Sequence, residues 1–509
     1  MSELIKPQNL VLSTEQLAML MPYLIVAAGA MLTLLAGVIR GSSDPEANRR
    51  KRNLAAVLVG IATVTAGLLY TAKIWGEPGA VLFNGMLAAD YYTGLMNAVF
   101  LAATGLVMLS SYSYLEKERI HHAEYYSLAL FSCLGMMLMA SALDLIVLFV
   151  ALEMMSLGVY VMVGFRRADV RSNEAAVKYF ILGSAVSAIF LYGVALLYGA
   201  TGSMNIAQLA TSLKSDPTGN PLLALGAVLV TVGFLFKIAS VPFHMWMPDV
   251  YEGAPTSVTN FMTTGLKAAA FAAFLRVFIG LNSGGQGGGG TEGGLDASLH
   301  DVLWVVALVT MFIGNVIALT QKNIKRMLAY SSIAHSGYIL VGLISGGKSE
   351  YGYSSVILYL IAYVVMNLGA FAIVAHLSER GDRRCDVEDY AGLGYRHPWL
   401  SFAMAVFMFS MAGVPPTVGF AGKYLIFSSA VQAGEIWLAV LGVLCSAIGA
   451  YYYLRVIVFM YMREPARAIA AKFAPAAALV VLVATAGTLQ FGVFPSMLIH
   501  AAKKAAMNI

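Results

Sequence analysis

The sequence is poor in charge for its length. Only 12% of its 509 residues are charged, whereas 59% are hydrophobic. A soluble core of this size could not bury so much apolar surface, which excludes an ordinary soluble protein. Apolar segments of about 20 residues, the length with which a helix crosses the hydrocarbon of a bilayer, follow one another almost from end to end. The sequence therefore predicts an all-α polytopic membrane protein.

Cysteine is equally scarce. The three cysteines are Cys133, Cys385 and Cys445, and none lies at the close pair spacing that zinc and iron–sulfur clusters use. We therefore expect no metal, no bound cofactor and no redox centre in this chain. The net charge of +5 is accounted for by basic loops, so nucleic-acid binding is not expected either.

About fourteen apolar segments are long enough to span a membrane. The predicted spans begin at Met19, Leu54, Tyr91, Tyr125, Leu143, Glu174, Pro221, Ser257, Asp301, Arg326, Ser354, Pro398, Ile436 and Pro475. The first segment has no basic leading region and no clear cleavage site, so we expect a span rather than a signal peptide. Because no loop could hold a folded soluble domain, we expect residues 1–509 to form one membrane domain.

A glycine-rich stretch from Ser283 to Gly294 is the one low-complexity segment. It is typical of a flexible external connection that has nothing to bury. We assign it no function.

Lysine and arginine are concentrated in alternate loops. The odd-numbered loops carry most of them, except the loop from Met247 to Thr256, which has neither and contains Asp249 and Glu252. Loops rich in Lys and Arg stay cytoplasmic. Both termini are therefore predicted to lie outside, on the periplasmic side of a bacterial inner membrane.

Two apolar stretches are interrupted by proline. Span seven contains Pro242 and Pro248 in the run FLFKIASVPFHMWMPD, and span twelve contains Pro415 and Pro416 in the run AGVPPTVGFAGK. Proline removes a backbone donor, and the freed groups are tolerated in a membrane only where protein or a water-filled cavity satisfies them. We therefore expect a broken helix in each of these spans.

The spacing of the two breaks, five spans apart, predicts inverted repeats with a site near the midplane. Five-helix repeats would then cover spans four to eight and nine to thirteen. The expected segments are an N-terminal three-helix part (1–120), a first repeat (121–282), a second repeat (300–462) and a C-terminal helix (463–509).

Four ionisable residues lie near the middle of apolar spans: Glu153, Lys237, Lys267 and Lys423. Such residues cost roughly 2.5 to 3.5 kcal/mol each on insertion scales and usually line an ion or proton path, so four of them at comparable depth predict a relay. Glu153 near Lys237 would keep the lysine protonated, and separation would let the proton go. The alternatives are structural: an ion pair for Glu153, snorkelling for Lys237 and a bond to a broken-helix carbonyl for Lys267.

Two histidines and a run of tyrosines are weaker indications of a functional role. His244 and His335 would serve either as hydrogen-bonded core residues or as proton shuttles that support the relay. The run from Tyr451 to Tyr453 is typical of an aromatic belt at the membrane interface.

Three long motifs carry a resemblance to a known family. The runs PFHMWMPDVYEGAPTSVTNFMTTGLK, QKNIKRMLAYSSIAHSGYILVG and AGVPPTVGFAGKYLIF resemble the antiporter-like proton-translocating subunits of respiratory NADH–quinone oxidoreductase, complex I, and of multisubunit cation/proton antiporters. The resemblance covers essentially the whole chain. The form DVYEGAP, the lysine at 423 and the lack of a long lateral helix after span fourteen are most similar to the N-type subunits of bacterial complex I.

The resemblance implies a role for each buried charge. Glu153 looks like the family's glutamate in span five, Lys237 like its partner in span seven, Lys267 like the central-axis lysine and Lys423 like the terminal lysine in span twelve. The implied activity is proton pumping driven by electron transfer from NADH to quinone. This chain would then be a subunit of a translocase without a redox centre or NADH site of its own.

The resemblance also implies where the redox groups and partners lie. NADH, flavin, iron–sulfur clusters and quinone would bind other subunits, and the partners would be further membrane subunits of complex I, including antiporter-like neighbours, together with lipid, water and protons. One rival is a subunit of a sodium/proton antiporter, which would use the same residues without redox coupling. A second rival is a structural membrane scaffold.

Overall fold

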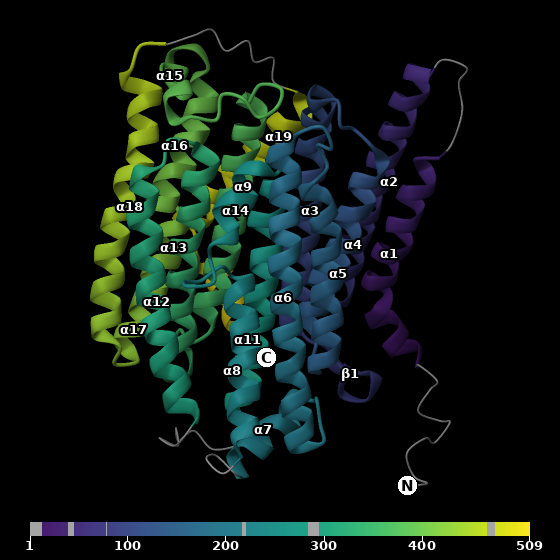
Figure 1. Cartoon of the computed structure of the whole chain (residues 1–509), viewed down its shortest axis with the longest axis vertical. Helices are drawn as coiled ribbons and strands as arrows, with labels where there is room; N and C mark the ends of the chain where they lie inside the picture. Colours follow the sequence, from purple (N-terminus) through teal and green to yellow (C-terminus); the bar gives the residue numbers. More distant parts are fainter. Residues whose placement is uncertain (1–12, 39–44, 78, 216–219, 284–294, 466–473) are drawn as a thin grey trace.

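The fold is a bundle of roughly parallel helices (Figure 1). The computed structural model describes residues 13–38, 45–77, 79–215, 220–283, 295–465 and 474–509. The glycine-rich residues 284–294 lie outside the described part. In Figure 1, α15 (Leu393–Arg396) lies at the upper end of the bundle and α7 (Ile206–Ser215) at the lower end. We call these the α15 end and the α7 end.

Twelve helices of the described chain are long and apolar enough to cross a membrane. They are α1 (Thr14–Ala36), α2 (Pro45–Ile74), α3 (Tyr91–Glu118), α4 (Ala123–Ser141), α5 (Leu145–Val163), α6 (Val170–Thr201), the continuous run of α10 (Thr256–Phe261), η3 (Met262–Leu266) and α11 (Lys267–Ser283), α12 (Leu295–Thr320), α13 (Ile324–Ser345), α14 (Ser354–Leu377), α18 (Ile436–Met462) and α19 (Pro475–Val493). The prediction of a helical, multi-pass membrane protein is confirmed. The count of fourteen spans stays a prediction.

Two further apolar helices, α8 (Pro221–Lys237) and α16 (Pro398–Ala412), are shorter. Each is followed by a non-helical segment and then by a second helix, α9 (Trp246–Gly253) after α8 and α17 (Val418–Gln432) after α16. The chain thus leaves helical geometry around Pro242 and at Pro415 and Pro416, where the sequence predicts a break, whereas Pro248 lies in the first turn of α9. Gly413 ends α16 with a φ of +89°, a left-handed conformation that glycine adopts without strain.

Several short elements lie outside the predicted spans. They are the antiparallel hairpin of β1 (Ala80–Leu82) and β2 (Leu87–Ala89), in which Ala80 pairs with Ala89, the turns η2 (Phe83–Gly85), η4 (Gly346–Lys348) and η5 (Val387–Tyr390), and the helices α7, α15 and α20 (Ser496–Ala506). A search for 20-residue apolar segments cannot detect elements of this length.

The interior of the bundle is formed by α13 and α14. In the most apolar part of each helix 94% of residues are buried, against 28% in α19 at the surface. α14 contacts α10, α16, α17 and α19. Polar side chains on α13 and α14 therefore have little access to lipid and must find partners within the protein.

A buried ion pair joins α3 to α11 towards the α7 end. Asp90 caps the first turn of α3, and its two carboxylate oxygens accept hydrogen bonds from Arg276 at 2.8 and 3.0 Å. Arg276, which is fully buried, also donates to Thr93 Oγ1 at 2.9 Å and to the carbonyl of Ala140 at 2.7 Å. The pair is bidentate and fully hydrogen-bonded, which is the geometry that offsets the cost of burying two charges.

Replacing Asp90 by alanine should strongly destabilise the protein. The substitution leaves a buried guanidinium without its counter-ion, which costs about 3 to 5 kcal/mol. The measurement is the thermal unfolding midpoint of the detergent-solubilised protein. The matched control is Glu350→Ala, which breaks an exposed pair with Lys503 at 3.2 Å and should change stability by about 1 kcal/mol or less. Equal midpoints for the two variants would contradict the assignment.

Candidate functional site

Glu153 lies on α5 and is partly exposed at the side of the bundle. The hydroxyl of Ser187 on α6 donates to its carboxylate. Val150 and Leu157, one turn away on either side, are exposed. The carboxylate is therefore held between two helices and also opens towards the outer surface of the chain.

Lys237 is the last residue of α8 and is buried. Its ammonium donates to Ser156 Oγ at 2.9 Å and lies 3.5 Å from the hydroxyl of Tyr160, both of which are on α5. It also lies 5.8 Å from the ring centre of Tyr160. The first helix break thus places its lysine against α5 rather than towards lipid, which excludes snorkelling in this structure.

Glu153 and Lys237 form no direct ion pair within the described structure. Glu153 belongs to α5, and Lys237 contacts that helix one turn later, because Ser156 follows Glu153 by three residues and so shares its face of α5. The two charged groups are therefore separated, and the ammonium of Lys237 bonds a serine hydroxyl that lies one turn along α5 from the carboxylate.

Lys267 lies directly after the π-helical turn η3 and is buried. Its ammonium donates to the carbonyl and the hydroxyl of Ser332 on α13. The hydroxyl of Tyr363 on α14 donates to the same Ser332 Oγ at 2.7 Å. π-helical turns inside α-helices occur frequently at functional sites, and this one precedes the central lysine.

His335 lies one turn after Ser332 on α13 and is buried. Its two ring nitrogens contact the hydroxyls of Tyr359 at 2.5 Å and of Tyr453 at 3.1 Å. A neutral imidazole donates through one nitrogen and accepts through the other, so the ring can pass a proton between two hydroxyls. His335 therefore continues the polar line that begins at Lys267.

Lys423 lies in α17 after the second break and is buried. It donates to the carbonyls of Met411 and Ala412, at 2.9 and 3.1 Å, and to Ser446 Oγ at 2.7 Å. The two carbonyls belong to the last turn of α16, where a helix leaves its acceptors unsatisfied and carries partial negative charge. The break thus supplies the partners of the lysine.

The structure separates the remaining polar candidates. His244 lies in the break after α8, where its Nδ1 is buried without a hydrogen-bond partner in the described chain. The hydrogen bonds found for Lys237, Lys267 and Lys423 go to other residues. The prediction of an interfacial belt is wrong for two of the three tyrosines: Tyr452 and Tyr453 are 1% and 2% exposed, whereas Tyr451 is 62% exposed. Consecutive helical residues point about 100° apart, so a run of three cannot share one face.

Hydroxyl groups are the site residues that the sequence reasoning missed. None of the three lysines has a carboxylate partner within ion-pair distance in the residues that the structure describes. Their partners are serine and tyrosine hydroxyls and main-chain carbonyls, and hydroxyls both donate and accept. Such an environment accommodates a lysine as ammonium or as amine, and it therefore permits proton exchange. Only Ser156 carried a local signal, its spacing of three from Glu153.

Metal and cofactor ligands are not grouped in the described chain. No set of three or more His, Cys, Asp or Glu side chains in that part is placed to hold a metal ion. The three cysteines are buried and unpaired with one another.

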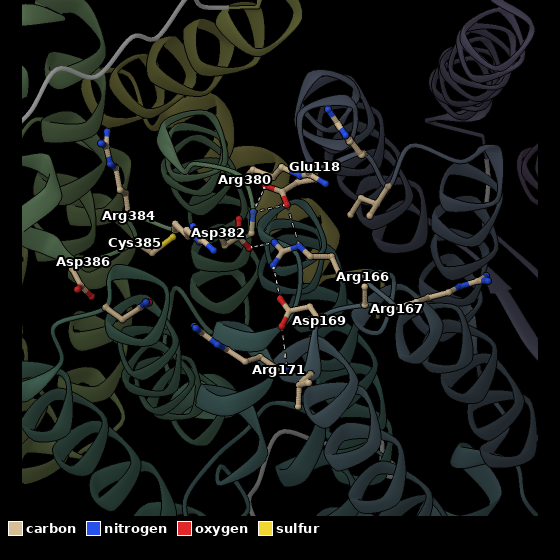
Figure 2. Close-up of a pocket in the computed structure, with 17 residues that line it drawn as sticks. Glu118, Arg166, Arg167, Asp169, Arg171, Arg380, Asp382, Arg384, Cys385 and Asp386 are labelled. Atoms are coloured by element: carbon tan, nitrogen blue, oxygen red, sulfur yellow. Dashed lines mark hydrogen bonds and ion pairs between the residues drawn. The ribbon is translucent and has the colours of Figure 1, made fainter. Parts of the chain in front are cut away.

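A second polar centre, which the sequence reasoning also missed, lies at the α15 end (Figure 2). Asp382 accepts hydrogen bonds from Arg166, from Lys325 at 3.0 Å and from the hydroxyl of Tyr114 at 2.8 Å. Burial raises the pKa of the Asp382 carboxyl, but the charges of Lys325 and Arg166 outweigh burial and hold its pKa below the usual range. The carboxyl is therefore ionised at neutral pH.

Comparisons with known proteins assign this chain to a family. Residues 142–449, more than half of the chain, match the family model described as NADH:quinone oxidoreductase/Mrp antiporter, TM. The chain is 44% identical to NADH-quinone oxidoreductase subunit N of Trichlorobacter lovleyi, over 97% of this chain and 98% of that protein.

Two solved structures show the same architecture. A chain of respiratory complex I from Thermus thermophilus with bound aureothin is 34% identical, with a TM-score of 0.78 over 94% of this chain and 98% of that one. A chain of the Mrp complex from Dietzia is 23% identical, with a TM-score of 0.82 over 96% and 97% of the two chains, which shows a shared fold. The chain thus belongs to the NADH:quinone oxidoreductase/Mrp antiporter transmembrane family and, within it, groups with subunit N of NADH-quinone oxidoreductases.

Proposed function

We propose that this chain is a membrane proton-translocating subunit of NADH:quinone oxidoreductase in the bacterial inner membrane. One observation carries the proposal: three buried lysines, which have no carboxylate partner among the described residues, lie at helix breaks or a π-helical turn, in a chain whose relatives over nearly its whole length are named subunit N. Hydroxyl-bound lysines at membrane depth are suited to carry protons and have little use in a purely structural bundle.

The proposed path runs along the membrane midplane. Protons enter from the cytoplasm in the first repeat, pass from Lys237 to Lys267 and then to Lys423, and leave on the outside. The hydroxyls around Ser332 and His335 support transfer between the second and third lysines. Glu153 acts as the modulator of Lys237, since the lysine bonds Ser156, one turn after Glu153 on α5.

The energy for this path comes from outside the chain. Moving one charge against about 100 mV costs about 2.3 kcal/mol, so translocation must be coupled to a reaction that releases energy. We assign NADH, flavin, iron–sulfur clusters and quinone to other subunits, as in an oxidoreductase that drives a separate membrane arm. The partners are further membrane subunits, and Glu153, open at the side of the bundle, is placed to respond to one of them.

The finer architecture that we propose has fourteen spans and two inverted five-helix repeats. The two interrupted pairs, α8 with α9 and α16 with α17, support it, because each has a lysine at its break. The proposed segments are 1–120, 121–282, 300–462 and 463–509 within one membrane domain.

The proposed orientation places the α15 end in the cytoplasm and both termini outside. The one odd loop without basic residues supports it, because its Asp249 and Glu252 pair with Arg326 of the next odd loop at 2.8 and 3.0 Å. At the α7 end, Lys504 lies 4.5 Å from the ring centre of Tyr91, and Met19 of α1 lines the same hollow as Tyr91. The two ends of the described chain therefore share one side.

Replacing Lys267 by alanine should abolish proton translocation while leaving the complex assembled. Removal of a proton-carrying group lowers the rate by roughly 10²-fold or more. The measurement is proton uptake by inverted membrane vesicles driven by NADH, with the amount of assembled complex determined on a native gel. The control Lys348→Ala removes an exposed lysine and should behave as wild type. Normal pumping in Lys267→Ala would reject the relay, and lost assembly with normal pumping per complex would favour the scaffold.

Replacing Ser156 by alanine should weaken pumping without abolishing it. Lys237 loses its 2.9 Å hydrogen bond, which is worth about 0.5 to 1.5 kcal/mol, and this predicts a roughly 2- to 12-fold change in rate. The same vesicle assay measures it. Ser345→Ala is the matched control, because within the described part of the chain the Ser345 hydroxyl bonds only its own helix, at the carbonyl of Val341. Equal rates for the two variants would remove Ser156 from the site.

Purification from native membranes separates redox-driven pumping from sodium/proton antiport. Peripheral subunits with flavin and iron–sulfur absorbance should accompany the chain. Small membrane partners alone would favour the antiporter, for which the shared Mrp fold gives the architectural precedent.

A further inference from the structure

An open cleft at the α15 end is lined by more arginines than carboxylates. It has a volume of about 1070 Å³, and its walls are the end of α3, the turn between α5 and α6, the start of α6 and the loop after α14. The lining includes seven arginines and four carboxylates: Arg119, Arg166, Arg167, Arg171, Arg380, Arg383 and Arg384, with Glu118, Asp169, Asp382 and Asp386. We call it the arginine cleft. Its lining carries three more positive than negative charges.

Three of the four carboxylates are used by a single arginine. Arg166, which is buried, lies within ion-pair distance of Glu118, Asp169 and Asp382. Arg384 pairs with Glu379 at 2.9 Å. The five other arginines of the cleft have no carboxylate within ion-pair distance in the described part of the chain. Membrane topology accounts for basic loops, but it does not account for their convergence around a cleft.

The loop after α14, which carries three of these arginines, is fixed through its backbone. The amide of Gly381 donates to both carboxylate oxygens of Glu118, at 3.1 and 2.9 Å. The amide of Glu379 donates to the carbonyl of Arg383 at 2.9 Å. A wall that is ordered before binding lowers the entropy cost of holding a ligand. The backbone of the cleft is therefore in place before a ligand arrives.

The arginines surround the cleft from more than one side. In the view of Figure 2, Arg380 and Arg171 lie on opposite sides of Arg166, whereas Arg167 extends away from the group. Arg171 belongs to the first turn of α6, and the N-terminus of that helix adds partial positive charge. An anion held in the cleft would therefore meet positive charge from two walls.

The composition of the lining favours phosphate groups over other parts of a ligand. A guanidinium donates two parallel hydrogen bonds to a phosphate, and arginines on separate walls suit neighbouring phosphate groups. The described lining holds no aromatic side chain on which a nucleotide base could stack. Its larger aliphatic side chains are Ile120 and Val170 alone among the described residues, which is too little to hold an acyl chain.

We propose that the arginine cleft binds a soluble polyphosphate anion, with Arg171 and Arg380 donating to phosphate oxygens from opposite walls. The site goes beyond the proposed function, because no step of the proton relay uses it and none of the relay lysines lines it. Arg119 and Arg383 add positive charge around the same anion. In the proposed orientation the cleft opens to the cytoplasm.

Equilibrium dialysis of the purified whole complex against radiolabelled inorganic pyrophosphate, without NADH, tests the site. The double variant Arg171→Gln with Arg380→Gln should bind pyrophosphate about tenfold more weakly or worse, because each substitution removes charge-assisted hydrogen bonds. The matched control is Arg396→Gln with Arg463→Gln, which removes the same charge from two exposed arginines outside the cleft. It should bind as wild type, and the difference between the two double variants separates the cleft from any site on another subunit.

Each outcome either supports the site or overturns it. Equal affinities of the two double variants would overturn it, because the arginines would then serve topology alone. If the first double variant fails to assemble, Arg119→Gln with Arg383→Gln decides, with the same expected loss.

Nanodiscs separate a soluble anion from a lipid headgroup, which offers the same phosphate chemistry. Pyrophosphate binding that persists in nanodiscs of phosphatidylcholine and of phosphatidylcholine with cardiolipin supports the soluble anion. Binding that disappears only with cardiolipin would overturn the soluble source and assign the cleft to headgroups. Because the assay contains no NADH, neither result depends on whether Lys267 carries protons, and failure of the cleft leaves the proposed function intact.

Discussion

The structure depends on how it satisfies positive charge inside an apolar bundle. An ammonium in hydrocarbon must have acceptors, and a helix break is a source of them, because the last turn before a break leaves its carbonyls free. Lys423 takes two such carbonyls from α16, and Lys237 is itself the last residue of α8. At Lys423, break and lysine therefore depend on each other: without the break the charge loses two of its acceptors, and without the charge the two carbonyls lose their donor. Lys237 instead finds its acceptors on α5, at Ser156 and Tyr160.

Sequence reasoning found the parts of this arrangement that are local. The prolines predicted where α8 and α16 end, and the depth of the lysines in their apolar runs predicted their burial. It could not find Ser332 or Tyr363 as partners of Lys267, because helices that are apolar on every side carry little information about which face meets which neighbour. The same limit applies to Tyr453. Whether its side chain faces lipid or His335 depends on how α18 is rotated in the bundle, and the sequence does not show that rotation.

The basic residues in and beside the loops matter for topology and also for the packing of the folded chain. As a sequence feature they indicate topology, but Arg166 and Lys325 also hold Asp382 over the first turn of α10. Asp382 adopts a left-handed φ of +49°, which aspartate tolerates better than most residues. No spacing rule connects a loop aspartate with basic residues more than fifty positions away, so this cluster emerges only from the three-dimensional structure.

Paired and unpaired charges mark two kinds of region. Arg276 and Asp90 form a bidentate pair that fixes α11 against α3. The relay lysines have hydroxyl and carbonyl partners instead, which accept from an ammonium without holding it by charge. Ion pairs thus lie at the edges of the site and add rigidity, whereas neutral partners surround the lysines within it, as the proposed proton exchange requires.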